Sequence, residues 1–169
     1  MSGEQPVIVG SGPRHREFVT SAVAVQAIIV NPLEQVVLLS SPERKQGWQV
    51  VSGALEVGET LLDGTLREIH EELGEGIQVR PLGMVHAETF HYDERVQYML
   101  GSYYLFAYQG GHIIPSDDMA GSEYRWWSTD ELTEELPLHR STRPWILKRA
   151  IALYRLWSQE ADLPLQPSL

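Results

Sequence analysis

The segment from Thr60 to Leu73 constrains the fold of this chain more than any other, because it carries a clear helical repeat. Apolar residues recur there at spacings of four, three and four: Leu62, Leu66, Ile69 and Leu73. Thr60 is suited to cap the helix, Asp63 lies near the positive end of the helix dipole, and Gly74 follows the last residue. The sequence therefore predicts an amphipathic helix whose apolar stripe packs on a core.

Segments rich in apolar and β-branched residues on both sides of this helix predict strands. The predicted strands are Phe18–Val30, Gln35–Ser40, Trp48–Val51, Ile77–Phe90, Val96–Tyr108 and Tyr124–Trp127. Ser128 and Glu131 have capping-box spacing and predict a short helix through Leu136, and Pro144–Trp157 predicts a final one. This order predicts an α/β (α+β) fold in which a mixed β-sheet is sandwiched between helices.

The length of 169 residues fits one domain, which we expect over residues 18–160, between an N-terminal arm (1–17) and a C-terminal tail (161–169). The first twelve residues lack the pattern of a secretory signal, and no apolar run is long enough to span a membrane. Cysteine is absent, which excludes disulfides, thiolate metal sites and cysteine nucleophiles. We expect a cytoplasmic protein without a membrane partner.

The charge balance argues against a nucleic acid polymer as partner. The chain has 23 acidic and 13 basic residues, for a net charge of −10. Such a chain repels a phosphate backbone unless its cations are strongly segregated. The nearest basic cluster, Arg140, Arg143, Lys148 and Arg149, is explained more simply as the exposed side of the last helix. A small polyanion remains compatible if metal ions neutralise an acidic site.

Such an acidic site is predicted on the helix itself. Glu68, Glu71 and Glu72 stand at positions i, i+3 and i+4, so their carboxylates converge on one side, with Arg67 as the local counter-charge. Like charges this close repel, and a hard divalent cation such as Mg²⁺, which prefers oxygen ligands, would relieve that repulsion.

A solvated acidic face is the simpler interpretation of the helix alone. The preceding loop favours a functional one, because Gly53, Gly58 and Glu59 precede a helix N-terminus, where backbone N–H groups can face an anion. The loop and the carboxylates occur together at fixed spacing.

The stretch from Gly53 to Gly74 resembles the box that defines the Nudix hydrolase family. The family pattern is Gly, five residues, Glu, seven residues, then Arg-Glu-apolar-any-Glu-Glu-any-Gly-apolar. All seven fixed positions match: Gly53, Glu59, Arg67, Glu68, Glu71, Glu72 and Gly74. Only the last position departs, because Glu75 replaces an apolar residue and the nearest one is Ile77.

The resemblance implies a role for each matching residue. Metal binding falls to Glu68, Glu71 and Glu72, aided by a carbonyl near Ser52 and by Glu59, directly or through water. Arg67 would orient Glu68. The resemblance implies that Gly53 and Gly58 shape the substrate loop, and Tyr92 lies where the diadenosine-polyphosphate branch carries a tyrosine. For the general base, Glu68 and Glu123 rank together, with Glu71, Asp117 and Asp118 as further candidates.

The implied activity is hydrolysis of a diphosphate bond in a nucleoside diphosphate linked to another moiety, with Mg²⁺ or Mn²⁺. The alternative is a Nudix-fold nucleotide-binding or sensor module without catalysis. Partners would be a small nucleoside diphosphate derivative and, by family default, a second copy in a homodimer. The tryptophans (Trp48, Trp126, Trp127) and the histidines His86 and His91 are more simply packing or surface residues than substrate contacts.

Overall fold

The computed structural model describes residues 7–9, 17–19, 21–40, 47–94, 96 and 98–159 of the chain. Of the expected N-terminal arm it describes β1 (Val7–Val9), which pairs antiparallel with β2 (Glu17–Val19). The rest of that arm and the expected tail over residues 161–169 lie outside the described residues.

The centre of the fold is a mixed β-sheet. Its strands are β3 (Ala22–Val30), β4 (Val36–Ser40), β5 (Trp48–Gln49), β6 (Val51–Ala54), β7 (Ile77–Phe90), β8 (Met99–Gly111) and β9 (Glu123–Trp127). The order is β5-β4-β3-β8-β7, with β6 also paired to β3 and β9 to β4. The pair β3–β8 is parallel and the other pairs within this sheet are antiparallel, so the sheet is mixed as the sequence predicts.

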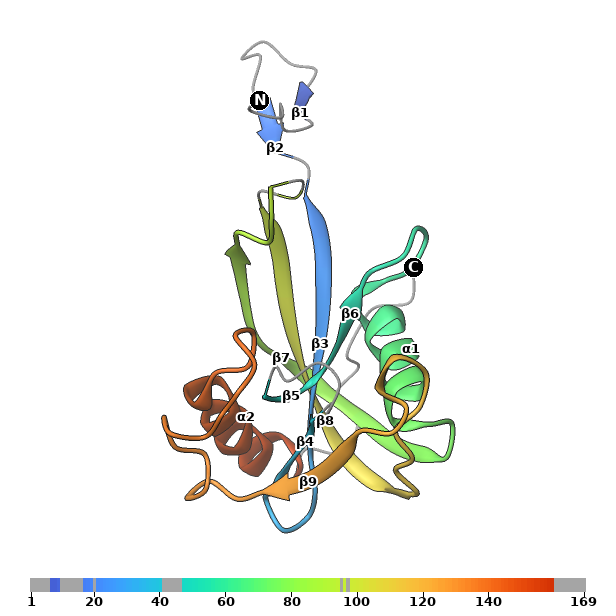
Figure 1. Ribbon diagram of the computed structural model, residues 1–169, viewed down its shortest axis with the longest axis vertical. Helices are drawn as coiled ribbons and strands as arrows, with labels where there is room; N and C mark the ends of the chain where they lie inside the picture. Colours follow the sequence, from blue (N-terminus) through green and yellow to red (C-terminus); the bar gives the residue numbers. More distant parts are fainter. Residues whose placement is uncertain are drawn as a thin grey trace.

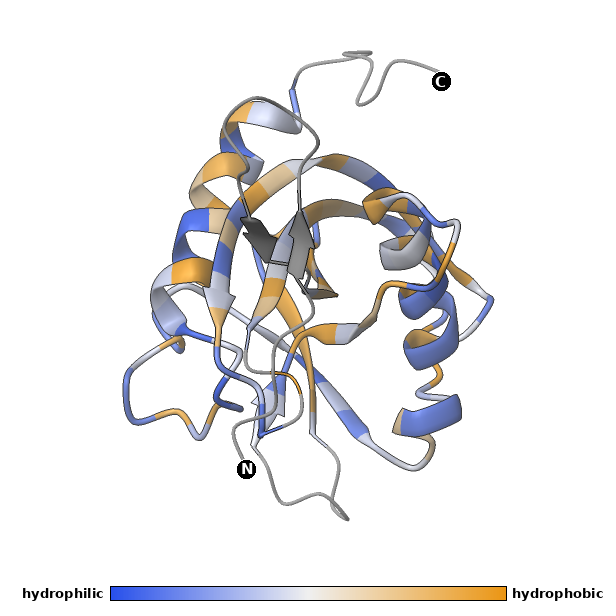
Figure 2. Cartoon of the chain, turned by 90° about the horizontal axis from the view of Figure 1, so that it is seen from above, coloured by the Kyte–Doolittle hydropathy of each residue, from blue (hydrophilic) through white to orange (hydrophobic). Residues whose placement is uncertain are grey.

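The two α-helices cover opposite faces of this sheet, as Figures 1 and 2 show. Side chains of β3 alternate between the faces. Ile28 and Val30 share a core with the buried side of α2 (Pro144–Trp157), whereas Ala27 and Ile29 share one with α1 (Leu61–Leu73). The predicted sandwich of helices around a sheet is therefore confirmed. Neither of these helices is long and apolar enough to cross a membrane.

Some predicted boundaries are wrong. The expected strand Phe18–Val30 is two strands, and Ser21, just before the second, donates its hydroxyl to the carbonyl oxygen of Tyr98. The expected strand Trp48–Val51 is likewise divided into β5 and β6, which pair with different partners. The downstream strand begins at Met99 and continues to Gly111.

The predicted helix from Ser128 to Leu136 is also wrong, because this segment forms turns. The capping contact does form, since the Glu131 carboxylate accepts from the backbone N–H and hydroxyl of Ser128. The chain must nevertheless reach β5 at once, where the Pro137 carbonyl accepts from the N–H of Trp48. This tertiary pairing leaves too few residues for a helix and overrides the local signal.

Candidate functional site

The site begins where β6 leaves the sheet and the chain enters α1. Thr60 caps the helix, its hydroxyl accepting from the N–H of Asp63 while the Asp63 carboxylate accepts from the N–H of Thr60. In the preceding loop, the N–H of Glu56 donates to Glu59 Oε2 at 2.9 Å. Gly58 has a φ of +92°, a conformation that glycine adopts without strain. The loop geometry thus directs the Glu59 carboxylate toward Arg67 of α1.

Arg67 holds the acidic side chains together. Its Nε lies 2.8 Å from Glu59 Oε1, and its Nη1 lies 2.8 Å from both Glu68 Oε1 and Glu71 Oε2. Its Nη2 donates to the Ala54 carbonyl oxygen at 2.9 Å, which ties the helix to the end of β6. The planar guanidinium suits this multiple contact, because its donors are fixed in a fork.

The electrostatics of the cluster follow from these contacts. Hydrogen bonds from Arg67 and from the N–H of Glu56 lower the pKa of Glu59. The carboxylates raise the pKa of Arg67, above all through Glu59. Burial raises the pKa of Glu68 from its ordinary value, although Arg67 opposes this shift. For Glu68, desolvation therefore outweighs the hydrogen bond and the charge of Arg67.

Two glycines make room for the cluster. A Cβ at Gly53 would lie 1.9 to 2.2 Å from the Glu68 carboxyl atoms, so the absence of a side chain lets Glu68 approach β6. A Cβ at Gly64 would lie 2.9 Å from Glu59 Oε2 and 2.7 Å from a methyl group of Leu55. The sequence interpretation passed over Gly64. Gly64 lies three residues before Arg67 and four before Glu68, so helical spacing could have placed it on the side of α1 that faces the cluster.

The remaining box carboxylate, Glu72, is buried, with 4% of its surface exposed. Beside it, Ser116 anchors the following loop to the last turn of α1, its N–H donating to the Glu72 carbonyl and its hydroxyl to the Glu71 carbonyl. This anchoring places Asp117 and Asp118, in the short 3₁₀ helix η1 (Asp117–Met119), near the C-terminal end of α1.

Among the described residues, the other predicted site residues Ser52, Glu123 and Tyr92 form no hydrogen bond or ion pair with Arg67. Ser52 is half-buried on β6, opposite Gln26 of β3. Glu123 is exposed at the start of β9, opposite Ser40. Tyr92, just after the end of β7, is 45% exposed and lies under the guanidinium of Arg140. The structure does not bring Glu123 or Tyr92 into contact with Arg67.

The donor set of the cluster is of the kind that binds a divalent cation, because the carboxylates of Glu59, Glu68 and Glu71 meet around Arg67 beside one loop. The bonds from Arg67 use one oxygen each of Glu68 and Glu71. Within the part of the chain that the structure describes, however, no three acidic or histidine side chains are already arranged to hold a metal ion. Binding therefore requires side-chain adjustment around Arg67.

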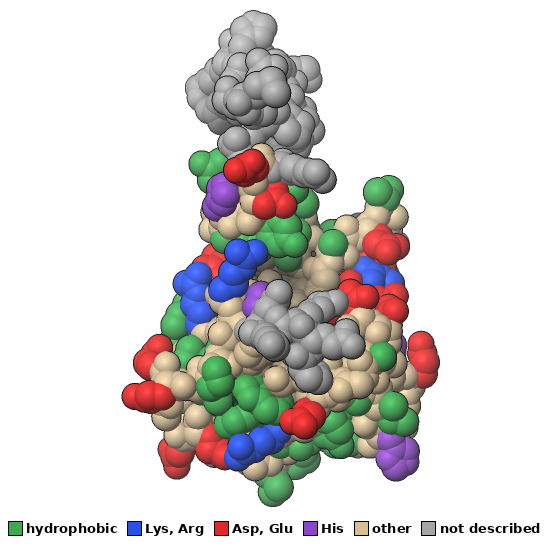
Figure 3. All heavy atoms as spheres, viewed as in Figure 1, with side chains coloured by type: hydrophobic (Ala, Val, Ile, Leu, Met, Phe, Trp, Pro, Cys, Tyr) green, Lys and Arg blue, Asp and Glu red, His purple; other side chains and the backbone are tan. Residues whose placement is uncertain are grey.

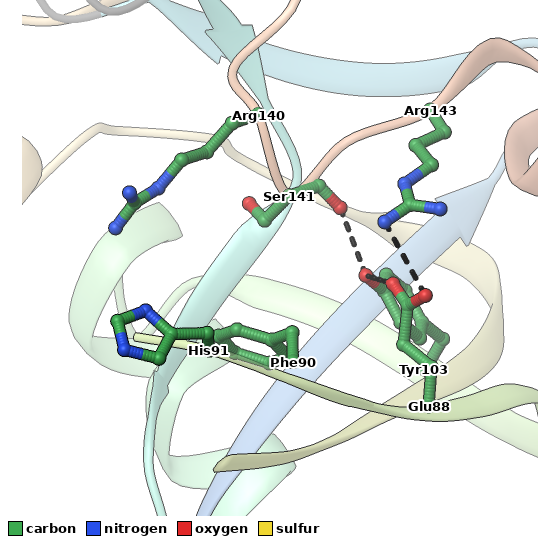
Figure 4. Close-up of a pocket in the computed structure, with 7 residues that line it drawn as sticks. All are labelled: Glu88, Phe90, His91, Tyr103, Arg140, Ser141 and Arg143. Atoms are coloured by element: carbon green, nitrogen blue, oxygen red, sulfur yellow. Dashed lines mark hydrogen bonds and ion pairs between the residues drawn. The ribbon is translucent and has the colours of Figure 1, made fainter. Parts of the chain in front are cut away.

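A second polar cluster lies on the same face of the molecule as the Arg67 cluster, between β7, β8 and the segment before α2 (Figure 4). It surrounds a cavity of about 190 Å³. The Tyr103 hydroxyl donates to the Ser141 carbonyl at 2.9 Å and lies 3.2 Å from Glu88 Oε1, and Arg143 Nη2 lies 3.3 Å from Glu88 Oε2. Burial and the Glu88 charge raise the pKa of Tyr103. No local pattern indicates this cluster, because its members come from three distant segments.

Figure 3 shows how the two clusters share one face of the molecule. Acidic side chains gather over the start of α1, and basic side chains gather over the segment that precedes α2.

Comparison with known proteins gives consistent matches. The model of the NUDIX domain matches residues 20–148. The chain is 28% identical over 141 residues to the NAD-capped RNA hydrolase NudC of Pseudomonas aeruginosa, covering 83% of this chain and 46% of that protein. It is 28% identical over 111 residues to NudC of Vibrio parahaemolyticus, covering 65% and 40% respectively. The chain thus spans about half the length of the curated relatives it matches.

Solved structures share the fold. An ADP-ribose pyrophosphatase from Streptococcus suis superposes with a TM-score of 0.63 at 19% identity, covering 80% of this chain and 93% of that one. A protein from Jonesia denitrificans, described as a possible asymmetric diadenosine tetraphosphate hydrolase, gives a TM-score of 0.63 at 20% identity, covering 86% of this chain and 100% of that one. At these identities the likeness shows the fold alone.

Proposed function

The chain belongs to the Nudix family, and on that premise we propose that it hydrolyses a diphosphate bond in a nucleoside diphosphate linked to another group. The observation that carries this proposal is the arrangement around Arg67, which gathers Glu59, Glu68 and Glu71 at the junction of loop and helix. A protein that only bound nucleotides would have no physical need for this concentration of acidic groups.

A divalent metal ion, Mg²⁺ or Mn²⁺, is part of the proposal. Glu68, Glu71 and Glu72 would hold it, with Glu59 and the backbone near Ser52 as further oxygen donors. When bound, such an ion neutralises a diphosphate and lowers the pKa of a water molecule. In this proposal Arg67 keeps Glu68 and Glu71 oriented, and the capped N-terminus of α1 fixes the loop that carries Glu59.

The general base is proposed among the same carboxylates. Glu68 is favoured by its position, because it lies inside the Arg67 cluster and against β6. Glu123 remains a candidate only if its strand end approaches the cluster when substrate binds, since it is exposed and apart from Arg67. Comparing the pH–rate profiles of the Glu68→Gln and Glu123→Gln variants distinguishes the two, because loss of the base removes the acidic limb of the profile.

The experiment that tests the function is a hydrolysis assay with Mg²⁺ and a broad substrate panel. It contains nucleoside diphosphates and triphosphates, ADP-ribose, sugar nucleotides, dinucleoside polyphosphates and NAD. We expect hydrolysis of at least one diphosphate, and a fall in kcat of about 100-fold or more in Glu72→Gln, a magnitude typical of lost electrostatic stabilisation.

Glu75→Gln is the matched control, because the Glu75 side chain is 91% exposed just beyond the helix and should be dispensable. Full activity in both Glu71→Gln and Glu72→Gln would refute the assignment of the ligands. Absence of hydrolysis across the whole panel would favour the alternative of a nucleotide-binding or sensor module.

The description of the curated relative raises the question whether the substrate is a small nucleotide or an RNA. NudC is described as acting on NAD-capped RNA. A net charge of −10 argues against a polymer here, so we propose that small nucleotides are preferred. Including NAD-capped RNA beside free NAD in the panel tests this preference directly. A homodimer remains a prediction from the family resemblance, and a cytoplasmic location remains a prediction from the sequence.

A further inference from the structure

The cavity beside Glu88 lies in register with the acidic site. Across the sheet, Glu88 of β7 is opposite Gly101 of β8, which pairs with Ala24 of β3, which pairs with Ala54 of β6. The Ala54 carbonyl accepts from Arg67, so this row ends at the acidic cluster. Three strand spacings separate the two ends, about 14 Å. That span suits an extended nucleotide with its diphosphate at one end and its base at the other.

The row between the two sites is built of small residues. In the middle of the row, Gly101 has no side chain and Ala24 has a single methyl group. Phe90 packs directly over Gly101, where an added Cβ would lie 3.1 Å from the ring. Phe90 therefore presents an aromatic side chain to the cavity (Figure 4). Arg140 reaches over the opposite side from the segment before α2. A planar aromatic group between a ring and a guanidinium is a favourable arrangement.

The polar groups here include the Glu88 carboxylate, which accepts hydrogen bonds, and the guanidinium groups of Arg140 and Arg143, which donate them. Glu88 forms one wall, and its carboxylate retains acceptor capacity beyond its contacts with Tyr103, Arg143 and His86, because two oxygens offer about four lone pairs. Behind Phe90 lies the side-chain amide of Gln26, which is 2% exposed, and among the described residues no donor reaches its Oε1. Gln26 does not line the cavity, so the Glu88 carboxylate is the acceptor that a ligand there can reach.

We propose that this cavity binds the nucleobase of the substrate and selects a base that carries an amino group, with Glu88 as the residue that accepts from it. This inference rests on the proposed function, since it assigns the base end of the same nucleotide. Arg140 and Arg143 also line the cavity, so the oxygens of such a base would face guanidinium donors while its amino group faces Glu88. A carbonyl in place of the amino group would direct an oxygen at the same carboxylate.

The test uses CDP-glucose and UDP-glucose, which differ at position 4 of the base by an amino group against a carbonyl. The full-length chain should show kcat/KM at least about tenfold higher for CDP-glucose, the scale of one hydrogen bond to a charged group. In Glu88→Gln the ratio should fall toward one or invert, because an amide can donate to the carbonyl. Glu94→Gln, on the exposed loop after β7, is the control and should keep the ratio.

A binding measurement separates this inference from the proposed hydrolysis. In EDTA, CMP should shift amide resonances of β7 and residues 140–143 at lower concentration than UMP does. Arg140→Ala should weaken CMP binding, whereas Arg149→Ala, exposed on α2, should not. If no diphosphate of the panel is hydrolysed but CMP binds here, the proposed function fails and the base site stands. Equal binding of CMP and UMP, or shifts elsewhere, would overturn the base site.

Discussion

Replacing Gly53 by alanine should separate activity from stability. The added Cβ would lie 1.9 Å from Glu68 Oε1, whereas real contacts of this kind stay beyond 3.0 Å, so the carboxylate must move by at least 1 Å. Because the clash is with the end of a flexible side chain, the fold should tolerate it. Alanine also reduces the entropy of the unfolded chain, so we expect the free energy of unfolding to change by less than about 1 kcal/mol.

The displaced carboxylate should nevertheless abolish most catalysis. A displacement of about 1 Å at a reacting centre costs on the order of 100-fold in rate. The assay is kcat with the best substrate of the panel, beside a thermal melt of the same preparation. Gly58→Ala is the contrasting variant, since its Cβ meets nothing within 4 Å but its φ of +92° is strained for alanine, so it should lose about 1 kcal/mol of stability. Unchanged kcat in Gly53→Ala, or a collapse of its Tm, would refute this reasoning.

Three further perturbations test the cap of α1, the Arg67 contacts and the contact between Ser128 and Glu131. Thr60→Ala removes the helix cap and should cost about 1 kcal/mol, lowering Tm by roughly 2–4 °C; an unchanged melt would contradict the capping role. Arg67→Lys cannot reproduce the forked contacts and should lower kcat about 10- to 100-fold, whereas wild-type kinetics would show that the bridge is dispensable. Hydrogen bonds from Ser128 lower the pKa of Glu131 below its ordinary value of 4.5, so this carboxylate stabilises the fold above that pH and stops doing so as the pH falls through its folded pKa. Glu131→Gln should therefore lower Tm at pH 7 but much less at pH 3, and equal losses at both would argue against the linkage.

Local sequence signals predicted the parts of the site that lie on one element. The apolar stripe and the pairing of Arg67 with Glu71 at i+4 follow from helical periodicity, and Thr60 was identified from its cap position. Helix α1 begins and ends where that periodicity does. The helix predicted after Ser128 failed for the opposite reason, because pairing of Pro137 with Trp48 decides the conformation there.

Contacts between distant segments could not be predicted in this way. Glu88, Tyr103 and Arg143 meet only because β7, β8 and the segment before α2 converge, and no spacing along the chain encodes that meeting. The sequence also could not predict every contact of Arg67. Its bond to the Ala54 carbonyl depends on where β6 ends, and the sequence interpretation placed that strand end three residues too early.

The central claim is that the carboxylates of α1 hold a divalent cation. Its most direct test is the Mn²⁺ affinity of the intact chain, measured by electron paramagnetic resonance at neutral pH. The acidic side of α1 should bind the ion, and Glu72→Gln should weaken the affinity about tenfold or more, because an oxygen ligand is lost, while Glu75→Gln binds as the wild type does. Equal Mn²⁺ affinity in the wild type, Glu71→Gln and Glu72→Gln would contradict the account.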